Sequence, residues 1–324
     1  MSRPGITVVV PLFNKAPHVA RLMDSLASQT RAPDEIIVVD DASTDGGGEA
    51  IAALAPPNLR LLHRTSPGAG GYAARNAGIK AARSEWIAFL DADDAWRPHA
   101  LAEAERLIDL SDSGVSCVFT AFERDYGGGR ITPSTAMGRL AEADHTRLDF
   151  AAFVQAWLAS GQSPMWTSAV VARRSALIAA GLLPAGRCNR GGDKDTWLRL
   201  LAAGDALCSG MVTATYHRDA VNMVTRQTGT DQRPHLCSTL EALLPSLDPS
   251  TARAAERLIN LEITAHAREA WRCHRRIPAD LYRGFRVTRD PFAYALVRLL
   301  AGAPDGILAL SHRLRDLRRQ GIGA

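Results

Sequence analysis

The stretch GAGGYAARNAGIKAARSEWIAFLDADD, residues 68–94, decides between two α/β folds. Gly68, Gly70 and Ala73 form a G-x-G-x-x-A pattern before a helical segment, and the apolar run that follows ends at Asp91. This order matches a dinucleotide-binding fingerprint, in which the acid binds a ribose. The same run, however, ends in DADD, a group of acids that suits a divalent cation. One interpretation predicts hydride transfer with NAD, and the other predicts a nucleotide-sugar enzyme.

The spacing argues against the dinucleotide fingerprint. Its glycines must lie in a tight turn directly after an apolar strand, because the following helix has to meet the pyrophosphate close to the sheet. Here HRTSP, residues 63–67, separates the apolar run from Gly68. The NAD interpretation also leaves the acids at the end of an earlier run, Asp40 and Asp41, without a role. We therefore favour the cation site.

The first 108 residues alternate between apolar runs and segments of helical period, which predicts a doubly wound, mainly parallel, Rossmann-like α/β sheet. Parallel pairing follows because a βαβ crossover is right-handed and returns the chain to the same edge. The expected strands are 6–13, 35–43, 59–63 and 85–91, and the expected helices are 18–30, a segment starting at 43, and 72–83.

Polar residues follow three of these strands, at the edge where open α/β sheets bind ligands. They are the segment 11–14, the pair Asp40 and Asp41, and the acids of 91–94. Three carboxylates within four residues repel one another unless they share a cation. Oxygen ligands of this kind suit Mn²⁺ or Mg²⁺, which leave their other positions to substrate phosphates and water.

The pattern after residue 108 is less regular. We expect an amphipathic strand at 115–125, a turn and loop at 127–139, a helix at 148–160, and a strand joined to a helix at 168–181. Residues 191–204 place two acids at the start of a helix, and a strand follows. The chain from 236 to 324 reads as helices rich in Ala, Leu and Arg.

Composition limits the cellular setting and the partners. Five scattered cysteines without C-x-x-C spacing indicate a reducing compartment, and no signal-peptide pattern precedes the first strand. Residues 236–324 carry 14 Arg and 9 Asp or Glu. This tail suits either peripheral membrane contact through 290–320 or a helical cap or oligomer contact. We expect a cytoplasmic protein, either soluble or peripheral at the inner face of the cytoplasmic membrane, that binds no nucleic acid.

Four separated motifs together carry a family resemblance. VVVPLFN (8–14), VVDD (38–41), the stretch 68–94 and GGDKDTWLRL (191–200) resemble the family 2 glycosyltransferases of the GT-A fold. The resemblance covers about residues 5–220. It implies a nucleotide-sugar-binding half at 1–108 and an acceptor-binding and catalytic half at 109–235, followed by the helical region at 236–324. The implied reaction is inverting sugar transfer from a nucleotide donor to a glycan or lipid-linked acceptor.

The resemblance also assigns donor-binding residues. Pro11, Phe13 and Asn14 correspond to the segment that packs against the nucleotide base. Asp41 takes the position that accepts a hydrogen bond from uracil, which favours a UDP-sugar. Arg75 faces the nucleotide, where its guanidinium suits a phosphate.

The metal and the catalytic base follow from the same resemblance. Asp91 is expected near the ribose and beside the metal, Asp93 as the direct ligand of Mn²⁺ or Mg²⁺, and Asp94 behind them. His217 lies where relatives carry a His or Arg near the diphosphate and is a possible further metal ligand, and a histidine satisfied at a strand edge is an equally good interpretation. Asp193 is the candidate general base. The family's usual Glu before this Asp is replaced by Gly192, which leaves the acceptor contacts open.

Two other functional classes remain as alternatives. A non-catalytic relative that binds nucleotide or glycan would explain the missing Glu. A nucleotidyltransferase would need a Gly-rich loop after the first strand, where this chain has PLFNKAP. Arg outnumbers Lys by 35 to 3, which is typical of a GC-rich bacterial genome, so bacterial cell-envelope polysaccharide synthesis is the expected context.

Overall fold

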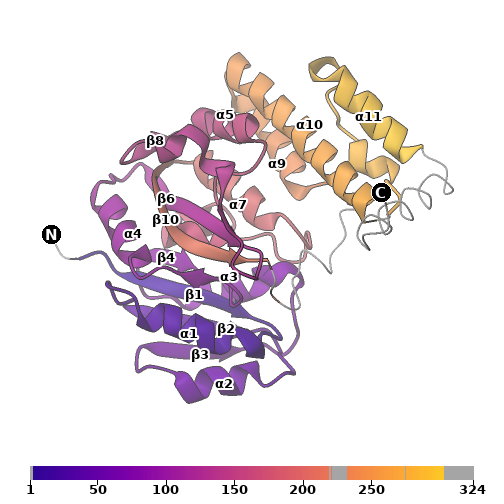
Figure 1. The fold of residues 1–324 in the computed structure, drawn as a ribbon. Helices are drawn as coiled ribbons and strands as arrows, with labels where there is room; N and C mark the ends of the chain where they lie inside the picture. The colour runs from indigo at the N-terminus through magenta and orange to yellow at the C-terminus, as the bar shows by residue number, and fades with distance from the viewer. Residues whose placement is uncertain (1–2, 219, 221–231, 274, 303–324) are drawn as a thin grey trace. The chain divides into compact units, whose positions relative to one another are not determined.

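The computed structural model describes residues 3–218, 220, 232–273 and 275–302. The chain divides into two compact units, Met1–Gln227 and Thr228–Ala324. The first unit contains one ten-stranded sheet in the order β3-β2-β1-β4-β9-β6-β10-β5, with β7 paired to β6 and β8 to β10 (Figure 1). The strands are β1 (Ile6–Leu12), β2 (Glu35–Asp40), β3 (Leu59–His63), β4 (Trp86–Phe89), β5 (Ala95–Trp96), β6 (Val115–Asp125), β7 (Ile131–Pro133), β8 (Thr146–Leu148), β9 (Val170–Arg173) and β10 (Asp205–His217).

The α/β prediction is confirmed, and the sheet is mixed. Strands β3, β2, β1 and β4 are parallel, as the alternating pattern predicts. Strand β9 then lies antiparallel between β4 and β6, and β6 pairs in parallel with β10. All residues of β2 and β4 are buried, as expected for strands that helices cover on both faces.

Except for α4, which the sequence pattern did not predict, and α2, which begins at Gly47 and not at 43, the helices of the first unit begin and end close to the predicted positions. They are α1 (Val19–Ala27), α2 (Gly47–Leu54), α3 (Tyr72–Ala81), α4 (Ala100–Asp109), α5 (Phe150–Ser160), α6 (Arg174–Ala179) and α7 (Gly192–Leu201). The expected turn and loop at 127–139 is partly wrong, because it contains β7 and part of a 3₁₀ helix, Thr135–Ala141. Gly127, Gly128 and Gly129 all have positive φ, and the tight turn they form brings β7 back onto β6.

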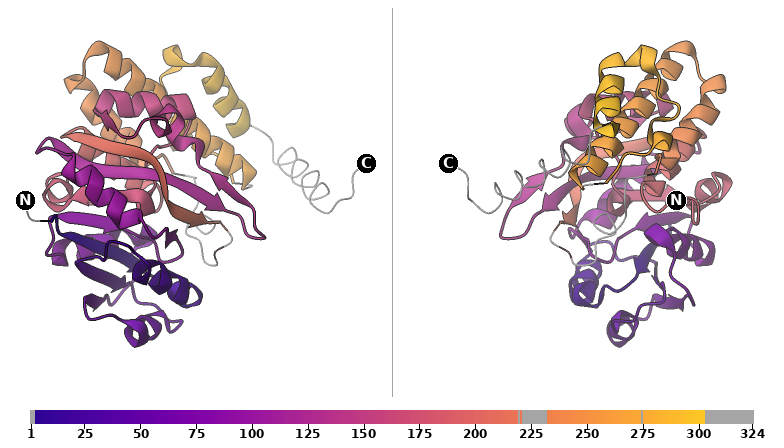
Figure 2. Two further views of the ribbon diagram at one scale, coloured as in Figure 1. Left: turned by 60° about the vertical axis from the view of Figure 1, so that its left-hand side comes forward. Right: turned by 90° about the vertical axis from the view of Figure 1, so that its right-hand side faces the viewer.

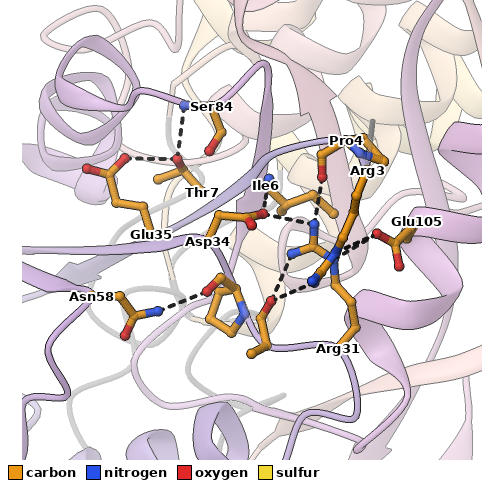
Figure 3. Close-up of polar contacts among 12 residues, drawn as sticks. Arg3, Pro4, Ile6, Thr7, Arg31, Asp34, Glu35, Asn58, Ser84 and Glu105 are labelled. Atoms are coloured by element: carbon orange, nitrogen blue, oxygen red, sulfur yellow. Dashed lines mark hydrogen bonds and ion pairs between the residues drawn. The ribbon is translucent and has the colours of Figure 1, made fainter. Parts of the chain in front are cut away.

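A polar network binds the amino ends of β1 and β2 (Figure 3). Arg31 is 5% exposed and donates to the carbonyl oxygen of Pro4 at 2.6 Å and to Asp34 Oδ2 at 2.9 Å. The same Asp34 oxygen accepts from the amide of Ile6 at 2.8 Å. Buried charges are tolerated where they are paired in this way. The network fixes this end of the strands, and their carboxyl ends lie at the opposite edge.

The second unit is helical. Its main helices are α9 (His235–Leu243), α10 (Pro249–Arg272) and α11 (Pro291–Ala301), and α10 contacts both of the others. Figure 2 shows these orange and yellow helices packed side by side. On α11, Phe292 is 87% exposed and Leu299 is 71% exposed. The membrane contact expected through 290–320 remains a prediction, since 303–320 lie outside the described residues. None of the described helices is long and apolar enough to span a bilayer.

Helix α3 packs tightly on β1, and Gly78 lies at that contact. A Cβ at this position would overlap the Val9 side chain, which is 0% exposed. Gly-to-Ala in an open helix stabilises by about 1 kcal/mol. We expect Gly78→Ala instead to lower the free energy of unfolding by about 1–2 kcal/mol, because overpacking outweighs propensity. Urea denaturation measures this change.

A double-mutant cycle supplies the control. In a Val9→Ala background the overlap is absent, so the methyl group that Gly78→Ala adds should cost nothing or stabilise. Equal effects of Gly78→Ala in both backgrounds would contradict the packing explanation.

Candidate active site

The carboxyl ends of β1, β2 and β4 meet at one edge because the three strands are parallel and adjacent (Figure 1). Leu12 pairs with Asp40 in the register, and the amide of Asp41 donates to the carbonyl oxygen of Leu12 at 2.8 Å. Phe13 is 42% exposed at this edge. Asn14 follows with φ 51°, and its Oδ1 accepts from the amide of Thr44 at 2.8 Å. The predicted base-binding segment, which starts at Pro11, is therefore tied to the loop after β2.

The glycine-containing loop is attached to Asp41. The amide of Gly68 donates to Asp41 Oδ2 at 2.9 Å, and Arg64 forms an ion pair with the other carboxylate oxygen. Asp41 is 1% exposed, so this pairing is needed to keep a charge there. The neighbouring Asp40 accepts from the amide of Ser43 at 2.9 Å and supports the turn. The loop therefore lies beside the second strand end and not in a turn directly after a strand.

Two basic side chains form ion pairs with Asp91 and Asp93, the first two acids of the DADD sequence. Arg75 on α3 is 7% exposed and forms an ion pair with Asp91. Burial alone would lower the pKa of Arg75, but Asp91 outweighs this and raises it. Lys15 Nζ lies 2.6 Å from Asp93 Oδ2, and Arg21 donates to the carbonyl oxygen of Asp93 at 2.7 Å. The structure thus brings Arg75, Asp91 and Asp93 together and adds Lys15.

Asp94 lies beneath these acids, 1% exposed. Its Oδ2 accepts from Ser168 Oγ at 2.6 Å and from Trp166 Nε1 at 3.0 Å. Burial raises the pKa of Asp94 well above its ordinary value, and the charges of Asp93 and Asp91 raise it further, against the two hydrogen bonds. The cluster therefore favours any added positive charge.

Asp193 lies in the first turn of α7 and accepts from Thr167 Oγ1 at 3.1 Å. The residue before it, Gly192, donates its amide to the Tyr72 hydroxyl at 2.8 Å. A Cβ on Gly192 would lie 2.8 Å from Tyr72 Cζ and 2.7 Å from Pro184 Cγ. Tyr72 and Pro184 thus fill the space that a Glu side chain at 192 would need.

Asp195, on the same helix as Asp193, and the candidate His217 each pair with a charged side chain. Asp195 is 1% exposed and accepts from Arg199 Nε at 2.9 Å. Arg199 also donates to the carbonyl oxygen of Leu182 at 2.8 Å, so this pair holds α7 to the preceding loop. His217 Nδ1 lies 3.3 Å from Asp125 Oδ2 at the ends of β10 and β6. Its expected place near the diphosphate remains a prediction.

The acids suit a cation that substrate shares, and not one held by protein alone. Within the described residues, no group of three or more His, Cys, Asp or Glu side chains is arranged to hold a metal ion. Mg²⁺ and Mn²⁺ accept one or two carboxylates with phosphate oxygens completing the shell. Asp93 and Asp91 offer such a pair, and the raised pKa of Asp94 shows that negative charge there is undercompensated.

Sequence reasoning missed the contacts that four residues make in the site. Lys15 adjoins a predicted residue, Asn14, but its pairing with the distant Asp93 has no signal in the sequence. The segment Trp166, Thr167 and Ser168 contacts both Asp94 and Asp193 through side chains. The available clue was its position at the start of the strand predicted within 168–181, but the pairing of that strand, β9, with β4 was not predictable from the sequence.

The family-model description "Glycosyl transferase family 2" matches residues 7–175, more than half of the chain. The chain belongs to glycosyl transferase family 2. This membership resolves the opening alternative, because the G-x-G-x-x-A loop lies within the matched region of a glycosyltransferase model. The succinoglycan biosynthesis protein ExoO of Rhizobium meliloti is 41% identical over 111 residues, which cover 34% of this chain and 30% of ExoO. The chain aligns with about a third of the length of the curated relatives it matches.

Solved structures share the GT-A fold. The crystal structure of Staphylococcus aureus TarS 1-349 in complex with UDP-GlcNAc has a TM-score of 0.67 and 14% identity, covering 98% of this chain and 92% of that one. The mannosyltransferase PcManGT of Pyrobaculum calidifontis, in complex with GDP-Man and Mn²⁺, has a TM-score of 0.56 and 18% identity, covering 98% and 81%. At these identities the likeness concerns the fold.

Asp94 makes stability depend on pH in a defined direction. A carboxyl whose folded-state pKa is raised contributes its full stability below its unfolded pKa and loses it as pH rises through the folded pKa. In Asp94→Asn the group cannot ionise and keeps an acceptor oxygen. In EDTA, we expect the variant to gain about 1–2 kcal/mol relative to wild type as pH rises from about 5 to about 9.

The measurement is urea denaturation at several pH values. Asp24→Asn, at an exposed position on α1, is the matched control and should track wild type. An Asp94→Asn variant that loses stability relative to wild type with rising pH would show that Asp94 is stabilised as the anion.

Proposed function

We propose that the protein is an inverting glycosyltransferase that moves a sugar from a UDP-sugar to a glycan or lipid-linked acceptor. The observation that carries the proposal is the grouping of four carboxylates, Asp41, Asp91, Asp93 and Asp193, around the carboxyl ends of β1, β2 and β4. Arg75 and Tyr72 on α3 link them: Arg75 pairs with Asp91, and Tyr72 accepts from the residue before Asp193.

The donor half is formed by the first two strand ends. Phe13 is exposed where a nucleotide base would pack, between Pro11 and the tied-down Asn14. Asp41 would accept from a uracil N–H, with Arg64 and the Gly68 amide holding its carboxylate in place. Asp91 would face the ribose, and Arg75, which pairs with Asp91, would contribute its positive charge to a donor phosphate.

Asp93 and Asp91 are the residues that would hold Mn²⁺ or Mg²⁺ together with the donor diphosphate. A divalent ion at this place supplies positive charge to the departing diphosphate. Lys15 pairs with Asp93, so its ammonium group would lie beside the phosphate oxygens of a donor held there and would add positive charge to them. Asp94 would stay behind the site, held by Ser168 and Trp166.

Asp193 would take the proton from the acceptor hydroxyl as that oxygen attacks the sugar. A general base needs a fixed orientation within hydrogen-bond reach of its proton. Thr167 provides one contact that fixes Asp193, and the first turn of α7 provides the other. Attack opposite the leaving group by a hydroxyl, without a protein nucleophile, inverts the anomeric carbon. This arrangement also argues against a non-catalytic relative, because the base survives although the Glu is lost.

The proposed context is bacterial cell-envelope polysaccharide synthesis at the cytoplasmic side of the membrane. The relative ExoO is named for succinoglycan biosynthesis, and TarS and PcManGT were solved with nucleotide sugars. The Arg-rich composition agrees with a bacterial source.

A thermal-shift panel of nucleotide sugars, with Mn²⁺, Mg²⁺ or EDTA, tests the donor site together with two variants. We expect one UDP-sugar to raise the Tm only with metal, since a ligand of the native state stabilises by mass action. Asp93→Ala should lose this metal-dependent shift. Asp193→Asn should keep it and lose about 100- to 10,000-fold in the rate of UDP release.

Each result has a contrary outcome. Stabilisation by NAD(H) and by no nucleotide sugar would refute the donor assignment. UDP release at the wild-type rate in Asp193→Asn would remove the base assignment, and absence of UDP release from wild type despite donor binding would support the non-catalytic alternative.

Thr167 gives a second, finer prediction. Thr167→Val removes the hydroxyl that donates to Asp193 at nearly constant volume, so we expect about a 10-fold slower UDP release with unchanged donor binding. Thr167→Ser should restore most of the rate. A Thr167→Ser variant as slow as Thr167→Val would indicate that packing, and not the hydrogen bond, matters at this position.

A further inference from the structure

At the carboxyl ends of β6 and β10, acidic side chains of β6 lie on one face of the sheet and arginine side chains of both strand ends lie on the other. The strands are parallel and in register, with Glu123 beside Thr215, Arg124 beside Tyr216, and Asp125 beside His217. Side chains alternate between faces along a strand. The sequence FERDY (122–126) therefore sends its two acids to one face, and its arginine and two aromatic residues to the other.

The acids are satisfied on their own face. Glu123 accepts from Arg97 at 2.8 Å and 2.9 Å and from Thr215 Oγ1 at 2.7 Å. Asp125 pairs with His217 at 3.3 Å and accepts from the amide of Gly127 at 2.8 Å. Neither carboxylate is directed to the opposite face.

The opposite face carries a continuous series of rings and guanidinium groups, here called the arginine–aromatic ladder. The Trp166 and Tyr216 rings lie 4.1 Å apart. Arg218 lies 5.5 Å from the Tyr216 ring and 5.8 Å from the Tyr126 ring, and Arg130 lies 4.5 Å from Tyr126. The ladder consists of Trp166, Tyr216, Arg218, Tyr126, Arg130 and Arg124.

One end of the ladder touches the candidate active site. Trp166 Nε1 donates to Asp94, and the next residue, Thr167, donates to the proposed base Asp193. The other end lies at the hairpin between β6 and β7, where Tyr126 is 37% exposed. Tyr216, between the two ends, is only 8% exposed, so an acceptor that reaches Asp193 would meet the ladder at its exposed members, Tyr126, Arg130 and Arg218.

Two arginines of the ladder, Arg124 and Arg130, have no acidic partner among the residues that the structure describes. Arg124 donates to a neutral partner, Gln162 Oε1, at 2.6 Å, and it lies 5.2 Å from the Phe122 ring. Burial lowers the pKa of Arg124, and the nearby Arg218 acts in the same direction. Within the described part of the chain, neither Arg124 nor Arg130 forms an ion pair. Guanidinium groups gathered in this way are suited to carboxylate or phosphate.

We propose that the arginine–aromatic ladder is the acceptor subsite and that the acceptor is an acidic glycan, whose carboxylate or phosphate groups pair with Arg124 and Arg130. This inference rests on the proposed function, because it takes Asp193 as the point of transfer. The exposed part of the Tyr126 ring offers an apolar surface to a sugar face. Uncharged glycans would give Arg124 and Arg130 no anionic partner and would bind more weakly.

Isothermal titration with trigalacturonate and with an uncharged galactose trimer tests the inference on the full chain. We expect trigalacturonate to bind more tightly than the neutral trimer, with an affinity that falls as salt increases. Arg130→Gln and Arg124→Gln should each weaken trigalacturonate binding by about 10-fold, as expected for loss of one charge-assisted pair. Arg83→Gln, whose side chain is 80% exposed on another part of the unit, changes the net charge equally and should bind as wild type.

Donor binding in the same variants separates this inference from the proposed function. A UDP-sugar with Mn²⁺ should raise the Tm of Arg130→Gln and wild type equally. If it does so while trigalacturonate binds no better than the neutral trimer, or binds Arg130→Gln and Arg124→Gln as tightly as wild type, the acidic-acceptor inference is wrong and the transferase remains. If no nucleotide sugar binds, the proposed function fails whatever the ladder binds. Arg130-dependent binding to phosphatidylglycerol vesicles, without binding of trigalacturonate, would assign the ladder to a membrane and overturn the inference.

Discussion

Repulsion among buried carboxylates at one sheet edge is the constraint on which the rest of this structure depends. Parallel β1, β2 and β4 bring their carboxyl ends together, and two of those ends are acidic. Three of the acids there have a compensating cation: Arg64 for Asp41, Arg75 for Asp91 and Lys15 for Asp93. Asp94 receives hydrogen bonds in place of a cation, and burial and the neighbouring carboxylates raise its pKa strongly. Burial raises the pKa of Asp91 as well, despite Arg75, so compensation is incomplete at both acids.

This compensation explains how the helices and strands around the sheet edge are held together. Arg75 is buried on α3 and cannot leave Asp91 without losing its partner, so α3 is fixed to the end of β4. Gly78 lets the same helix approach β1 closely. Tyr72, at the start of α3, then meets Gly192 at the start of α7. Glycine at position 192 thus allows the close packing of Tyr72 there, and this contact lies directly beside Asp193.

The sequence allowed prediction of the parallel half of the sheet, because its strands are continuous apolar runs and its helices have a clear period. It also located the acids, since the end of a strand is visible as the point where an apolar run stops. Partners far apart in the chain were not predictable: Lys15 and Asp93, or Thr167 and Asp193, meet through the order of strands in the sheet. The half of the sheet with antiparallel pairs was harder to predict, because β9 lies between β4 and β6 although it follows both of them in the chain. The hairpin at 127–139 was missed since three glycines resemble a loop.

The alternation of β6 shows how one short segment can serve structure and recognition at the same time. In FERDY, Glu123 and Asp125 pair with Arg97 and His217 and so complete the interior polar contacts of one face. Phe122, Arg124 and Tyr126 point to the opposite face. No acid among the described residues forms an ion pair with Arg124 there. If β6 slipped by one residue against β10, its side chains would exchange faces, and the Arg124 guanidinium would lie beside Arg97 and His217. The register between β6 and β10 therefore determines that the side chains next to Trp166 are positively charged. Because Trp166 contacts Asp94 and Thr167 contacts Asp193, the same register places this positive charge beside the proposed base.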